Sequence, residues 1–130
     1  MDVQQLRARN RFDVTLRSGL SLTIEIPNML DCMIAVNIPV PVLEHLRQVN
    51  EAAIHPNGKQ AKALSLEELG HVRAANIEGL RRAVKALEGT VLEVPLTTED
   101  VLSGFTDDEQ EELLEYLNRK RTDPKAGAPT

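Results

Sequence analysis

The segment Phe12–Ile26 constrains the fold more than any other part of the chain, because apolar and polar residues alternate on both sides of Arg17-Ser18-Gly19. Such alternation is typical of β-strands with one buried face. A three-residue connection with glycine in third place favours a turn that ends in a left-handed residue. We therefore predict an antiparallel β-hairpin over about residues 12–26. Its facing pairs are Leu16 with Leu20, Val14 with Leu22, and Phe12 with Ile24.

A hairpin with one apolar face needs a cover, because two strands alone are marginally stable in water. The best candidate begins at Ser65, which forms a capping-box pattern with Glu68. Apolar residues follow at helical spacing, and Gly89 supplies a typical C-terminal stop. The sequence thus predicts a helix from Ser65 to about Glu88, packed on the hairpin.

Further elements complete an α+β fold. The segment 29–36, capped by Asn28, is apolar on nearly every side, which is typical of a helix that is buried or awaits a partner. Helices are also predicted over about 41–53, 98–102 and 107–121, the last behind a Thr106–Glu109 capping box. Residues 91–94 form either a short strand or an extended connector, and residues 1–9 either a helical turn or an arm that docks on a neighbour.

These elements predict one compact domain over residues 1–121, in which the N-terminal antiparallel β-hairpin packs against three to four α-helices. Residues 122–130, rich in proline, glycine and alanine, predict a disordered tail. The loop signal His55-Pro56-Asn57-Gly58 predicts a mobile segment over about 55–63.

The composition and charge of the chain limit the classes of partner that it is expected to bind. The chain has 130 residues, a net charge of −5 and only 2% aromatic residues. Scarce aromatics and negative charge disfavour nucleic acid, which is bound by stacking platforms and basic surfaces. The excess of negative charge lies in residues 93–130, which contain ten acidic residues and four basic ones. The solvation of an exposed helix explains the negative charge of this C-terminal part, and binding of a basic partner is the alternative explanation.

The same sequence indicates a reducing compartment. Its single cysteine, Cys32, excludes an internal disulfide, and the polar segment Met1–Asn10 does not resemble a secretory signal. No apolar run approaches the roughly 20 residues that cross a bilayer. We expect a cytoplasmic protein that does not contact membranes.

No pattern of catalytic residues emerges. His45, His55 and His71 lack metal-ligand spacing, and one cysteine cannot complete a zinc site. Cys32 with a distant histidine is a formal nucleophile–base pair, although a buried structural cysteine is the simpler interpretation. Helix capping explains the acidic residues 107–112. We therefore predict no catalytic, cofactor or metal site, and no enzymatic activity.

Four segments together resemble the small tail assembly chaperones of long-tailed, siphovirus-like bacteriophages or prophages. They are the Val-Thr-Leu-Arg-Ser-Gly-Leu hairpin (residues 14–20), Ile38-Pro39-Val40-Pro41-Val42-Leu43, Leu96–Val101 and the acidic helix over 106–117. The resemblance covers roughly residues 12–117 and rests on short motifs and on the order of elements.

The resemblance implies a non-enzymatic protein of the host bacterial cytoplasm. Such chaperones bind the long helical tape-measure protein and help recruit tail-tube subunits during assembly. Met29, Met33, Val40 and Val42 are the candidate partner-binding residues, because flexible thioethers suit adaptable surfaces, although core packing also explains the methionines. A structural virion component, such as a tail or head-completion protein, is the alternative. The hairpin edges also offer a route to self-association.

Overall fold

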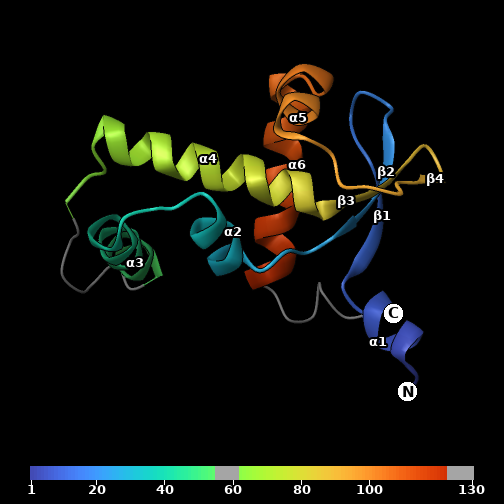
Figure 1. The fold of residues 1–130 in the computed structure, drawn as a ribbon, viewed down its shortest axis with the longest axis horizontal. Helices are drawn as coiled ribbons and strands as arrows, with labels where there is room; N and C mark the ends of the chain where they lie inside the picture. The colour runs from blue at the N-terminus through green and yellow to red at the C-terminus, as the bar shows by residue number, and fades with distance from the viewer. Residues whose placement is uncertain (55–61, 123–130) are drawn as a thin grey trace.

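The computed structural model describes residues 1–54 and 62–122, and its fold is α+β, as the sequence predicts (Figure 1). Four antiparallel strands form one sheet in the order β1-β2-β3-β4. The strands are β1 (Arg11–Thr15), β2 (Ser21–Glu25), β3 (Val84–Leu87) and β4 (Thr90–Val91). The N-terminal hairpin therefore forms half of a wider sheet.

The predicted hairpin register is confirmed. Phe12 pairs with Ile24 and Val14 with Leu22. At the turn, the Leu16 N–H donates to the Leu20 carbonyl over 2.8 Å. Gly19 has a φ of 94°, which a residue with a Cβ rarely adopts, so the glycine is required there. Apolar side chains of both strands lie on one face, and Leu16, Leu22 and Ile24 are almost fully buried.

The described part of the chain contains six helices beside the sheet, and the predicted N-caps at Asn28, Ser65 and Thr106 are present. Residues 55–61 and 123–130, which hold most of the predicted mobile segment and all but the first residue of the predicted tail, lie outside the described residues. Within the described ranges, no helix combines the length and apolar character needed to cross a membrane. The helices are α1 (Val3–Ala8), α2 (Met29–Ala35), α3 (Val40–Ile54), α4 (Leu66–Ala83), α5 (Thr98–Gly104) and α6 (Asp107–Thr122).

The prediction of a helix reaching Glu88 is wrong at its C-terminal end. Helix α4 stops at Ala83, and the next residue already belongs to β3, which pairs with β2. Glu88 and Gly89 have φ values of 49° and 80°, as a two-residue turn between β3 and β4 requires. Pairing with the open edge of the hairpin therefore replaces the last turn of the predicted helix, and Gly89 is a hairpin residue rather than a helix stop.

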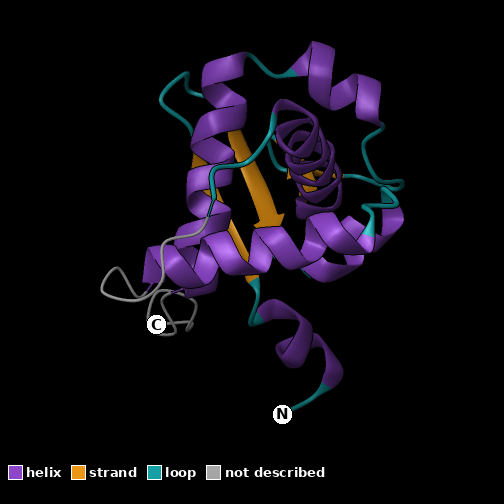
Figure 2. Ribbon diagram, turned by 90° about the vertical axis from the view of Figure 1, so that its left-hand side faces the viewer, coloured by secondary structure: helices purple, strands orange, loops and turns teal. Residues whose placement is uncertain are grey.

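The apolar face of the hairpin is covered by three helices (Figure 2). Leu80 and Ala83 of α4, Val101 of α5, and Leu113 and Leu117 of α6 are each at most 1% exposed. The N-terminal turns of α4 contribute little, since Leu66 is 87% exposed. The predicted cover is thus correct for the C-terminal half of α4, and α6 supplies much of the rest.

Acidic residues of α6 also hold the hairpin turn. The Arg17 backbone N–H donates to both carboxylate oxygens of Glu112, over 3.1 and 3.3 Å. The Ser18 hydroxyl donates to Glu109 over 2.7 Å, and this hydrogen bond, followed by the one from the Thr106 backbone, lowers the pKa of Glu109. The sequence predicts only helix capping for these acidic residues. In the structure, Glu109 and Glu112 also bind the hairpin turn.

Candidate functional site

Helix α2 packs on α4 through one side of its apolar surface. Cys32 is fully buried, as expected for a structural cysteine. Gly79 of α4 lies under Met29, because a Cβ built on this glycine would stand 3.2 Å from the methionine sulfur and 3.9 Å from a ring carbon of Pro27. The absence of a side chain at Gly79 thus lets α2 approach α4 closely.

The other side of α2 is exposed. Leu30 and Ile34, four residues apart and therefore neighbours on the helix surface, are 58% and 61% exposed. Val40, at the start of α3, is 75% exposed. We name Leu30, Ile34 and Val40 the α2–α3 surface. A contiguous exposed apolar patch is typical of an interaction site, and within this set Leu30 and Ile34 lie side by side on α2.

The predicted partner-binding residues divide between this surface and the interior. Val40 belongs to the α2–α3 surface, whereas Met29, Met33 and Val42 are half-buried. Sequence reasoning missed Leu30 and Ile34. Their spacing of four was visible, but in a helix that is apolar on every side the spacing does not tell which face points outward.

Helix α3 is joined to α4 by His45. Its Nδ1 lies 2.6 Å from Oε2 of Glu68, and its Nε2 lies 2.7 Å from the Lys62 carbonyl oxygen. The hydrogen bond to Glu68 is the main cause of a raised His45 pKa. In turn, the Ser65 backbone N–H and then His45 lower the pKa of Glu68. His45 therefore has a structural role between two helices.

A buried carboxylate fixes the other end of α4. Glu78 accepts hydrogen bonds from Arg81 over 2.7 and 3.1 Å and from Arg82 over 2.9 Å. Arg81 also donates to the Leu96 carbonyl over 3.3 Å, which ties the helix to the segment before α5. The hydrogen bond from Arg81 is the largest of the effects that lower the pKa of Glu78 to about 2.

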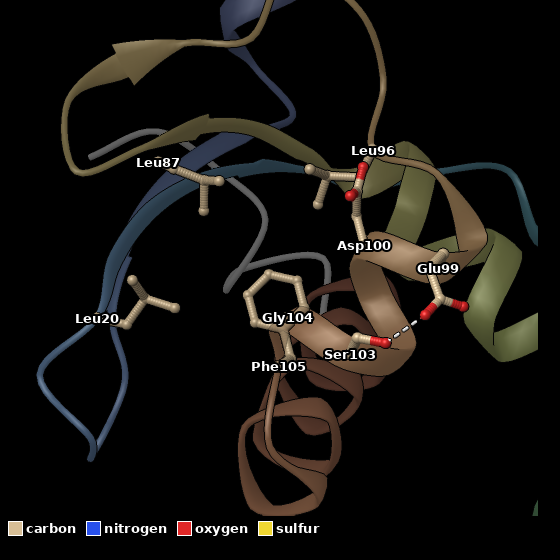
Figure 3. A pocket seen from close by; sticks show the side chains of 8 residues that line it. All are labelled: Leu20, Leu87, Leu96, Glu99, Asp100, Ser103, Gly104 and Phe105. Carbon is tan, nitrogen blue, oxygen red and sulfur yellow. Dashed lines mark hydrogen bonds between the residues drawn. The ribbon is translucent and has the colours of Figure 1, made fainter.

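An open pocket of about 530 Å³ lies between the sheet and α5 (Figure 3). Its apolar lining comes from Leu20 after the hairpin turn, Leu87 of β3, Leu96 and Phe105. Glu99, Asp100 and Ser103 of α5 lie along it, and the Ser103 hydroxyl donates to Glu99 over 2.6 Å. The pocket is therefore apolar inside and acidic along one side.

The residues considered for chemistry lie apart or have structural contacts. Cys32 is buried in α2, His71 lies on α4, and His55 lies outside the described residues. Among the residues that the structure describes, no group of three or more histidine, cysteine, aspartate or glutamate side chains is arranged to hold a metal ion. The acidic side chains Glu109 and Glu112 bind the hairpin turn.

No family model, curated protein or solved structure matches this chain. Among the described residues, the α2–α3 surface and the pocket beside α5 are candidate binding sites.

Proposed function

We propose that this protein is a non-enzymatic tail assembly chaperone of a long-tailed bacteriophage or prophage, acting in the host cytoplasm. It would bind the tape-measure protein and help recruit tail-tube subunits during tail assembly. The observation that carries the proposal is the exposed α2–α3 surface, since a chaperone of a long helical client needs an apolar face accessible on the folded protein. The motif resemblance supplies the identity of that client.

The form of α2 supports a mode of binding in which a client helix packs on the exposed face of α2. Leu30 and Ile34 present an i, i+4 pair, the spacing by which one helix packs on another. Met33, half-buried beside them, can change rotamer at low cost. Adaptable side chains next to fixed aliphatic ones suit a client whose apolar residues vary along its length.

The test is co-expression of this chain with a candidate tape-measure protein, taken from the unusually long open reading frame expected to follow its gene. We expect a soluble complex that Leu30→Ser and Ile34→Ser together weaken about tenfold or more, the effect of removing two apolar side chains from an interface. Leu66→Ser is the matched control, because Leu66 is 87% exposed at the start of α4.

Two results would reject the proposal. One is the failure of the tape-measure protein to form any soluble complex with this chain. The other is the presence of this chain in purified, mature particles at the stoichiometry of a structural subunit, which would favour a tail or head-completion protein.

A further inference from the structure

Helix α1 carries a second set of exposed apolar residues and differs in charge from the rest of the molecule. Val3 and Leu6, three residues apart on one helix face, are 59% and 55% exposed. Residues 1–10 contain two arginines and one aspartate, whereas the chain as a whole has a net charge of −5. This segment is therefore an apolar and basic arm on an acidic protein.

The pocket beside α5 has the complementary chemistry. Leu20, Leu87, Leu96 and Phe105 provide an apolar interior open to solvent. Glu99 and Asp100 provide the charged side, and no lysine or arginine is among the described residues that line this pocket. An aliphatic side chain followed by a cation would match both parts.

The arm presents such a pair. Arg9 is exposed and continues the right-handed helical backbone of α1, with a φ of −61° and a ψ of −27°. Residues three apart on a helix lie on the same side, so Arg9 follows Leu6 along one face. If Leu6 enters the pocket, Arg9 lies within reach of its acidic side.

The two features cannot meet within one molecule. Helix α1 precedes the start of β1, whereas Leu20 follows the hairpin turn at the other end of that strand. The five residues of β1 separate them by roughly 17 Å along a rigid strand. Figure 1 shows α1 below the sheet and α5 above it. A matching arm must therefore come from a second copy.

We infer that α1 of one copy docks in the pocket beside α5 of another, with Leu6 in the pocket and Arg9 facing Glu99. This contact joins two different surfaces, so it is head-to-tail and continues into rings or short filaments unless it is blocked. The contact area is small, so the association is weak and depends on concentration and salt. It uses neither Leu30, Ile34 nor Val40 and is independent of the proposed function.

The test uses two full-length variants that each remove one side of the contact. Leu6→Ser removes the apolar side chain from the arm, and Glu99→Lys reverses the charge beside the pocket. Sedimentation velocity over about a hundredfold concentration range should show association of the wild-type chain. Each variant alone should raise the dissociation constant at least about tenfold, the effect of one buried leucine or one opposed charge.

Mixing the two variants gives the decisive result. The intact arm of Glu99→Lys can dock in the intact pocket of Leu6→Ser. The pocket of Glu99→Lys and the arm of Leu6→Ser are both altered, so neither can bind a third copy. We therefore expect a one-to-one heterodimer and no larger species. Leu66→Ser and Glu67→Lys, exposed positions on α4, are matched controls that should associate as the wild type does.

Three outcomes would overturn the inference. They are a wild-type chain that stays monomeric over the whole range, association that persists in both variants, and a mixture that forms no heterodimer although circular dichroism shows both variants folded.

Discussion

The imidazole of His45 lies between the Glu68 carboxylate, 2.6 Å from Nδ1, and the Lys62 carbonyl oxygen, 2.7 Å from Nε2. An ionised carboxylate and a carbonyl can only accept hydrogen bonds, so both ring nitrogens must donate. Only the doubly protonated imidazolium does this. The contact that joins α3 to α4 is therefore strongest when His45 carries a charge.

The first prediction concerns the pH dependence of this contact. The folded protein raises the His45 pKa above 6.5, so its stabilising contribution is complete below pH 6.5 and is lost as pH rises through the folded value. We expect hydrogen exchange of the α3 amides, corrected for its intrinsic pH dependence, to quicken over that interval. The charged groups at the imidazole are Glu68, which favours the imidazolium, and Lys62, which opposes it.

The variant His45→Gln provides the control for this pH effect. A glutamine does not titrate, so exchange in α3 should be faster than in the wild type below pH 6.5 and should lose the additional pH dependence. Equal corrected exchange rates in wild type and variant at pH 6 would contradict a structural role for the imidazolium.

A second prediction follows from the buried Glu78 carboxylate. A pKa lowered from 4.5 to about 2 corresponds to about 3 kcal/mol of stabilisation at neutral pH. Solvent screens part of this, because the Arg82 side chain is 38% exposed. We expect Glu78→Gln to lower the free energy of unfolding at pH 7 by about 2 kcal/mol.

The pH dependence of that loss distinguishes charge from packing. The stabilisation by Glu78 is complete above the unfolded pKa of about 4.5 and disappears as pH falls through the folded value of about 2. Urea unfolding of wild type and Glu78→Gln should therefore converge between these values. Glu93→Gln, at an exposed acid, should change stability little at any pH. A difference between wild type and Glu78→Gln that persists at pH 2 would show that packing, and not charge, is responsible.

The hairpin was predictable because its determinants are local. Alternation over Phe12–Ile26 and the glycine of the turn specify both faces and the register within fifteen residues. The capping boxes at Ser65 and Thr106 are local in the same way, and both are present.

Long-range contacts decided what the sequence could not predict. Residues 84–87 fit a helical stripe, but the open edge of β2 makes them a strand. The binding of the hairpin turn by Glu112 joins residues 95 positions apart. The pocket beside α5 combines Leu20, Leu87 and Phe105, whose spacing in the chain carries no pattern. Which face of α2 is buried follows from its packing on α4, where Met29 lies against Gly79, and this contact cannot be read from the residues of α2 alone.

The contact between Met29 and Gly79 gives a third prediction, which compares Gly70 and Gly79 of α4. Replacing glycine by alanine inside a helix stabilises it by about 1 kcal/mol. At Gly70 a new Cβ would contact nothing within 4 Å, so Gly70→Ala should show the full gain in chemical denaturation. At Gly79 the Cβ would lie 3.2 Å from the Met29 sulfur, which must shift, so Gly79→Ala should gain less.

The second change in this comparison isolates the methionine. In a Met29→Ala background the obstructing sulfur is gone, so Gly79→Ala should recover the gain seen at Gly70, because only the helix preference then remains. A gain at Gly79 equal to that at Gly70 in the wild-type background would mean that Met29 yields freely and that α2 is not positioned by this contact. The exposure of Leu30 and Ile34 would then depend on other contacts of α2, among them the burial of Cys32 and the Asn28 cap.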